Sequence, residues 1–117
     1  MKSALIVDDK FGERVGDILS KEGFFTIVYT NGLEAISAIE DGLKYDIALV
    51  DLSLWETGND PHMIDGRDII SLSKKLNPGI PVFVLSSYFG WKPSYCDGLI
   101  DKHSRDDLIS RVNSINL

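Results

Sequence analysis

The sequence contains a single cysteine, Cys96, and no long apolar run, and each absence excludes a class of protein. One cysteine cannot form an internal disulfide and leaves no paired-cysteine metal motif. A reducing cytoplasm is therefore the expected location. No apolar stretch approaches the roughly 18 residues needed to cross a bilayer, so membrane insertion is not expected. Met1 and Lys2 lead directly into the first expected strand, so no signal peptide is expected either.

Basic residues are outnumbered, with 12 Lys and Arg against 18 Asp and Glu and a net charge of −6. The basic residues are scattered, whereas binding to nucleic acid needs them clustered on one face. No nucleic-acid partner is therefore expected. The 117 residues, of which 44% are hydrophobic, fit one domain over residues 1–117 with a substantial core.

Two short apolar runs each end in acid. Ala4–Val7 leads into Asp8 and Asp9, and Ile47–Val50 leads into Asp51. Short apolar runs of this kind are typical of buried parallel strands. If both lie in one sheet, their carboxyl ends share an edge and three carboxylates lie close together. Such crowding is costly unless a cation neutralises it, and a hard, hydrated cation such as Mg²⁺ suits oxygen ligands.

Strand and helix patterns alternate along the chain. The expected strands cover residues 4–8, 25–29, 47–51, 81–86 and 98–101. The expected helices cover residues 11–22, 32–42 and 66–76, with a last helix that a capping box from Ser104 to Asp107 would open. The positions expected to face the core are Phe11, Val15, Ile18 and Leu19, then Ala35, Ile36, Ile39 and Leu43, then Ile69, Leu72 and Leu76, and finally Leu108, Val112 and Ile115.

This alternation predicts an α/β fold, a doubly wound parallel sheet of five strands with helices on both faces. Ligands of such sheets bind beyond the carboxyl ends of the strands. The polar residues expected at that edge are Asp8, Asp9, Asp51, Ser86 and Lys102.

Two connections depart from the regular pattern. Residues 52–65 form a long loop after Asp51, and residues 86–97 are barely long enough for a parallel crossover. Gly90 and Pro93 also oppose a regular helix in the second connection. Little or no helix is expected in residues 88–95.

At these residues the sequence resembles the receiver domain of two-component response regulators. The acidic pair after the first strand, the acid after the third, the serine after the fourth and the lysine after the fifth all match in order. The turn at residues 77–81 and the Asp65-Gly66 step match as well. The resemblance covers the whole chain and implies a flavodoxin-like sheet of order 2-1-3-4-5, with a shortened or missing fourth helix here.

The resemblance also implies a role for each site residue. Asp51 would accept a phosphoryl group from a histidine kinase or a histidine phosphotransfer protein. Asp8, Asp9, Asp51 and the backbone carbonyl of Ser53 would hold Mg²⁺. Lys102 and Ser86 would bind phosphoryl oxygens. The chain would then be a stand-alone phosphoacceptor with at most self-dephosphorylation activity, not an enzyme, and would signal by binding an unknown downstream protein.

Two departures concern the readout of phosphorylation. Leu99 stands where the family commonly has an aromatic residue that swings inward, so that switch cannot operate in its usual form. His103 stands where a proline usually follows the lysine through a cis bond. A trans bond is expected here, since cis bonds to other residues cost about 2.5–4 kcal/mol.

Each assignment has an alternative. Asp8 and Asp9 could only cap the first helix, Ser86 could be an ordinary strand end, and Lys102 could be a solvated lysine. The chain could be a degenerate receiver that binds partners without taking phosphate. It could also be a phosphohydrolase with Asp51 as nucleophile, although Ser53 stands where such enzymes need a second aspartate.

Overall fold

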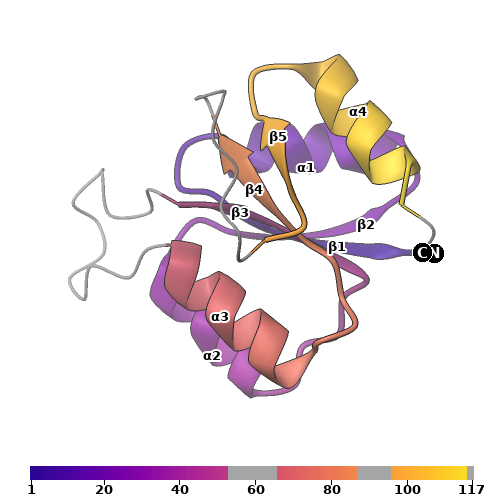
Figure 1. Ribbon diagram of the computed structural model, residues 1–117. Helices are drawn as coiled ribbons and strands as arrows, with labels where there is room; N and C mark the ends of the chain where they lie inside the picture. Colours follow the sequence, from indigo (N-terminus) through magenta and orange to yellow (C-terminus); the bar gives the residue numbers. More distant parts are fainter. Residues whose placement is uncertain (53–65, 87–95, 116–117) are drawn as a thin grey trace.

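Strands and helices alternate along the computed structural model, which describes residues 1–52, 66–86 and 96–115 (Figure 1). The strands are β1 (Ser3–Val7), β2 (Phe25–Tyr29), β3 (Ile47–Asp51), β4 (Val82–Ser86) and β5 (Gly98–Asp101). The helices are α1 (Gly12–Lys21), α2 (Gly32–Glu40), α3 (Gly66–Leu76) and α4 (Arg105–Asn113). Every expected strand and helix is present, and their ends differ from the expected ones by at most two residues.

The five strands form one parallel sheet of order β2-β1-β3-β4-β5, which confirms the predicted topology. The register between β1 and β3 pairs Val7 with Val50. The next residues, Asp8 just beyond β1 and Asp51 at the end of β3, therefore lie side by side at the carboxyl edge of the sheet. The register between β4 and β5 pairs Ser86 with Asp101, so Lys102 follows directly at the same edge.

Helices cover both faces of the sheet, α2 and α3 on one side and α1 and α4 on the other (Figure 1). The side chains of β1 alternate between the two cores. Leu5 and Val7 pack in the cluster beneath α2 and α3, and Ala4 and Ile6 pack in the cluster beneath α1 and α4. A central strand that is buried on both faces must be apolar at every position, which explains the uninterrupted apolar runs.

The predicted caps of α2 and α4 are present. The side chain of Asn31 accepts hydrogen bonds from the backbone N–H groups of Leu33 and Glu34, at 2.8 and 3.1 Å. The hydroxyl of Ser104 accepts from the backbone N–H of Asp107 at 3.1 Å. These bonds satisfy N–H groups that have no partner within the helix.

The buried face of α3 differs from the predicted one at Leu76, whose exposed fraction is 47%. Ile69 is buried and Leu72 packs half-buried against the same core, as expected. The other buried residues near them are Ile70 and Ser73. The serine hydroxyl lies 2.6 Å from the hydroxyl of Tyr45, and this hydrogen bond satisfies the buried polar group. The apolar pattern was misleading because one core position of this helix is polar.

β4 and β5 pair directly, although the connection between them is short. Most of that connection, residues 87–95, lies outside the described residues. The prediction of little or no helix in residues 88–95 therefore falls outside them as well. The long loop after Asp51 is described only at Leu52. None of the helices in the described ranges is long and apolar enough to cross a membrane.

Candidate functional site at the carboxyl edge of the sheet

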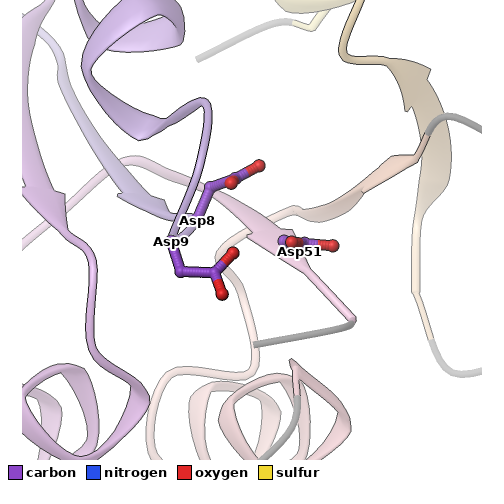
Figure 2. Close-up of side chains that lie close together, drawn as sticks. All are labelled: Asp8, Asp9 and Asp51. Carbon is purple, nitrogen blue, oxygen red and sulfur yellow. The ribbon is translucent and has the colours of Figure 1, made fainter. Parts of the chain in front are cut away.

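Three carboxylates meet at the carboxyl edge of β1 and β3. Asp8 and Asp9 lie on the turn that follows β1, and Asp51 is the last residue of β3 (Figure 2). One oxygen from each of the three lies within 4.8 Å of the others. Asp8 is fully buried and Asp51 is 5% exposed. Their grouping follows from the parallel register, as the sequence predicted.

Asp8 uses its two carboxylate oxygens differently. Oδ1 accepts hydrogen bonds from the backbone N–H groups of Lys10 and Phe11, both at 2.9 Å. Oδ2 is buried, has no hydrogen-bond partner among the residues that the structure describes, and lies 3.8 Å from Nζ of Lys102. Both bonds order the turn before α1 and neither caps a residue of that helix, whose N-cap residue is Phe11. The capping alternative therefore does not describe Asp8, and Oδ2 remains available to a ligand.

Asp9 is the least satisfied of the three acids. Both of its carboxylate oxygens are buried, and neither finds a hydrogen-bond donor within the described ranges. A buried carboxylate without a partner is costly. The capping alternative does not account for Asp9 either, because neither of its carboxylate oxygens accepts a hydrogen bond from a described residue. A cation beside Asp9 would satisfy both of its oxygens.

Lys102 brings a positive charge to the three acids. Its backbone N–H donates to the carbonyl oxygen of Ser86 at 3.1 Å, which continues the ladder between β4 and β5 by one step. Its Nζ lies 3.5 Å from Oδ2 of Asp51, and its side chain is 9% exposed. Lys102 is therefore not a solvated surface lysine.

The charges of these four side chains do not cancel. Three carboxylates and one ammonium carry two net negative charges in a site that is largely shielded from water. Oxygen ligands with this charge suit a hard divalent cation. Two oxygens on one Mg²⁺ lie at most about 4 Å apart, so modest side-chain rotation would bring this oxygen set onto one ion.

The remaining predicted site residues are Ser86 and Ser53. Ser86 ends β4 at the same edge, one residue beyond Leu85, which pairs with Asp51. Ser53 lies outside the described residues. The bond between Lys102 and His103 is trans, like every peptide bond in the described part of the chain.

Two residues at this edge have positions that sequence reasoning did not predict. Phe11 was expected only as a core residue of the first helix, but its ring lies beside Nζ of Lys102, 5.1 Å from the ring centroid. Gly66, at the start of α3, lies against the backbone of Asp51 and Leu52. The close spacing of Phe11 to the acidic pair was the available signal for the first. Only the Asp65-Gly66 step hinted at the second.

No family model matches the sequence. The chain is similar to sporulation initiation phosphotransferase F of Bacillus subtilis (strain 168), with 31% identity over 86 residues, which are 72% of this chain and 63% of that protein. The chain thus spans less than two thirds of the length of this curated relative.

Solved structures share the fold. A CheY-like response regulator receiver domain protein from Methanospirillum hungatei matches with a TM-score of 0.79 at 24% identity, over 97% of this chain and 92% of that one. The response regulator TrrA from Thermotoga maritima, solved in complex with Mg²⁺ and BeF, matches with a TM-score of 0.78 at 23% identity, over 97% of this chain and 98% of that one.

Proposed function

The chain belongs to the receiver-domain family of response regulators, and on that premise we propose that it accepts a phosphoryl group on Asp51 in phosphorelay signalling. The observation that carries the proposal is the meeting of three acids, of which Asp8 and Asp51 are buried, with the largely buried ammonium of Lys102 at a single sheet edge. The donor would be a histidine kinase or a histidine phosphotransfer protein. The phosphorylated chain would signal by binding a further protein.

The transfer would proceed by attack of an Asp51 carboxylate oxygen on phosphorus. A new oxygen–phosphorus bond forms, and the nitrogen–phosphorus bond to the donor imidazole breaks. The electron pair of that bond returns to the imidazole nitrogen, which takes up a proton from water. Positioning and electrostatics provide most of the catalysis in such a transfer, so the arrangement around Asp51 is decisive.

Three carboxylate oxygens of Asp8 and Asp9 accept no hydrogen bond from the described part of the chain, and such oxygens fit a divalent cation. Asp8, Asp9, Asp51 and the backbone carbonyl of Ser53 would hold Mg²⁺. When bound, the ion would offset negative charge on the phosphoryl oxygens. The Thermotoga protein was solved with Mg²⁺ and BeF, and we extend the same metal to this site by analogy of fold and donor set.

Lys102 and Ser86 would bind the transferred group. Nζ of Lys102 already lies 3.5 Å from Asp51 and can donate to a phosphoryl oxygen once the group arrives. The hydroxyl of Ser86, at the end of the adjacent strand, would donate to a second oxygen. The strand that carries this serine would then sense whether Asp51 is phosphorylated.

The test is intact-mass spectrometry after incubation with Mg²⁺ and phosphoramidate. The proposal predicts a gain of one phosphoryl group, absent in Asp51→Asn and without Mg²⁺, and retained in Asp41→Asn, an exposed acid at the end of α2. No adduct on the wild type would indicate a degenerate receiver that serves only as an interaction module. Multiple turnover of varied phosphoesters would indicate a phosphohydrolase.

A further inference from the structure

Phe11 lies on the turn between the acidic pair and α1, and its backbone is tied to the site. Its N–H donates to Oδ1 of Asp8 at 2.9 Å, and its carbonyl oxygen accepts from Val15 at 2.9 Å, which begins the helix. The side chain is half-buried and packs against the core cluster beneath α1 and α4. Phe11 therefore holds a defined position relative to Asp8.

The ring of Phe11 contacts the two residues that follow β5. Nζ of Lys102 lies over the ring, 5.1 Å from its centroid, within the roughly 6 Å over which a cation is attracted to an aromatic face. The ring of His103 meets it edge-on, with centroids 4.9 Å apart and planes at 83°, which is a favoured geometry for aromatic pairs. Both contacts join the turn after β1 to the turn after β5.

The lysine ammonium is not locked onto the carboxylates. Its distances to Oδ2 of Asp51 and Oδ2 of Asp8, 3.5 and 3.8 Å, exceed the roughly 2.7–2.9 Å of charge-assisted hydrogen bonds. A carboxylate accepts hydrogen bonds from the N–H groups of an ammonium. An aromatic face attracts the ammonium but competes only weakly for those N–H groups. An ammonium held in this way keeps its donors for an incoming group.

We propose that Phe11 is a positioning residue for phosphoryl transfer: its ring, held by His103, keeps the ammonium of Lys102 beside Asp51 and its N–H groups ready for a phosphoryl oxygen. This inference rests on the function proposed above for Asp51 and Lys102. Phe11 itself touches no reacting atom. Its effect on the reaction acts entirely through Lys102.

The kinetic test compares Phe11→Leu, which removes the aromatic face, with Phe11→Tyr, which keeps it. Phe24→Leu is the matched control, because Phe24 is half-buried against the same core cluster. With saturating Mg²⁺ and phosphoramidate, Phe11→Leu should be phosphorylated roughly three- to tenfold more slowly than wild type. Phe11→Tyr and Phe24→Leu should react at nearly the wild-type rate. Equal rates for Phe11→Leu and wild type, or an equal loss in Phe11→Tyr, would overturn the proposal.

A double substitution tests whether Phe11 affects the rate of phosphorylation through Lys102. In a Lys102→Met background, Phe11→Leu should cause no further loss of rate, because the group on which the ring acts is absent. A full additional loss would assign Phe11 a different role. Amide NMR spectra and Mg²⁺ titration by calorimetry should show a folded protein with unchanged metal affinity in Phe11→Leu.

The NMR shift of the Lys102 ε-methylene protons tests the ring contact without any phosphorylation. A ring beside the ammonium should shift these protons upfield, and Phe11→Leu should abolish the shift while Phe24→Leu preserves it. If the wild type takes no phosphoryl group, the proposed function fails, and the shift still decides whether Phe11 positions Lys102. An ordinary lysine shift in the wild type would overturn the inference even if Asp51 is phosphorylated.

Discussion

Gly66 lies so close to Asp51 that a Cβ on the glycine would be 2.2 Å from the aspartate's carbonyl oxygen and 2.8 Å from Cα of Leu52. The glycine N–H donates to the carbonyl oxygen of Leu52 at 3.1 Å. The first residue of α3 thus packs against the backbone that carries the proposed phosphoacceptor. Only a residue without a side chain allows this approach, because the opposing atoms belong to the backbone and cannot rotate away.

Gly66→Ala should therefore displace the backbone at the end of β3. The expected loss in the free energy of unfolding is about 1–3 kcal/mol, as for other insertions into packed interiors. Phosphorylation of Asp51 should slow as well, because the carboxylate moves relative to Lys102. Chemical denaturation and phosphorylation rates measure the two effects. Gly79→Ala is the control, since a Cβ at Gly79 meets nothing within 4 Å; equal effects of the two substitutions would contradict the steric argument.

Asp9→Asn should stabilise the metal-free protein by about 1–2 kcal/mol, because it removes one of three crowded charges and an unsatisfied buried carboxylate. Mg²⁺ should raise the melting temperature of the wild type by binding only its folded state. That rise should be largely lost in the variant, which lacks a charged ligand.

Glu40→Gln is the control for Asp9→Asn, because it removes the same charge from an exposed position at the end of α2. Its melting temperature should rise with Mg²⁺ as in the wild type. An unchanged response to Mg²⁺ in Asp9→Asn would show that Asp9 is not a metal ligand.

Lys102→Met should destabilise the metal-free protein, whereas Asp9→Asn should stabilise it. Loss of the ammonium leaves the acids without their positive neighbour and should cost about 3 kcal/mol of stability, as when one partner of a buried ion pair is removed. Mg²⁺ should bind more tightly, because a repelling charge is gone. Calorimetric titration and denaturation with and without Mg²⁺ measure both effects.

A surface pair provides the comparison for Lys102. Nζ of Lys21 lies 3.3 Å from Oδ2 of Asp17, but the two side chains are 70% and 69% exposed. Lys21→Met should change stability by less than about 0.5 kcal/mol and leave Mg²⁺ affinity unaltered. If Lys102→Met is equally mild, the ammonium does not balance the acidic cluster.

The sequence was sufficient to predict the meeting of Asp8, Asp51 and Lys102, because each stands at the carboxyl end of a strand and parallel strands end at one edge. The two uses of the Asp8 carboxylate were not predictable. They depend on which oxygen faces the turn and which faces Lys102. Strand pattern fixes where a side chain leaves the sheet, whereas the partner of each atom is set by the packing of the turns.

The incorrect expectation for Leu76 and the missed contact of Phe11 with Lys102 have the same physical origin. Leu76 was expected in the core of α3, but that helix buries Ser73, whose hydroxyl bonds to Tyr45. A hydrogen bond between distant residues makes a polar position interior, and hydrophobic periodicity cannot detect it. The contact of Phe11 with Lys102 likewise joins residues from opposite ends of the chain.

Asp107 stabilises the turn that carries Lys102, and its contact differs from the expected capping box. The N-terminal half of the box is present, from the N–H of Asp107 to the hydroxyl of Ser104. The carboxylate of Asp107 instead accepts from the backbone N–H of Asp101 at 2.8 Å. Because Asp101 immediately precedes Lys102, this bond ties the end of β5 to the first turn of α4.

Asp107→Ala should therefore lower the free energy of unfolding by about 1–2 kcal/mol, because the part-buried N–H of Asp101 loses its acceptor. Phosphorylation should slow too, because the backbone of Lys102 becomes less constrained. Asp106→Ala is the matched control: both acids lie in the first turn of α4, so both substitutions lose the same favourable interaction with the helix dipole. Asp107→Asn keeps a side-chain oxygen acceptor and should restore most of the stability. If Asp106→Ala and Asp107→Ala are equally destabilised and phosphorylated at equal rates, the helix dipole accounts for the whole effect and the bond to Asp101 does not position Lys102.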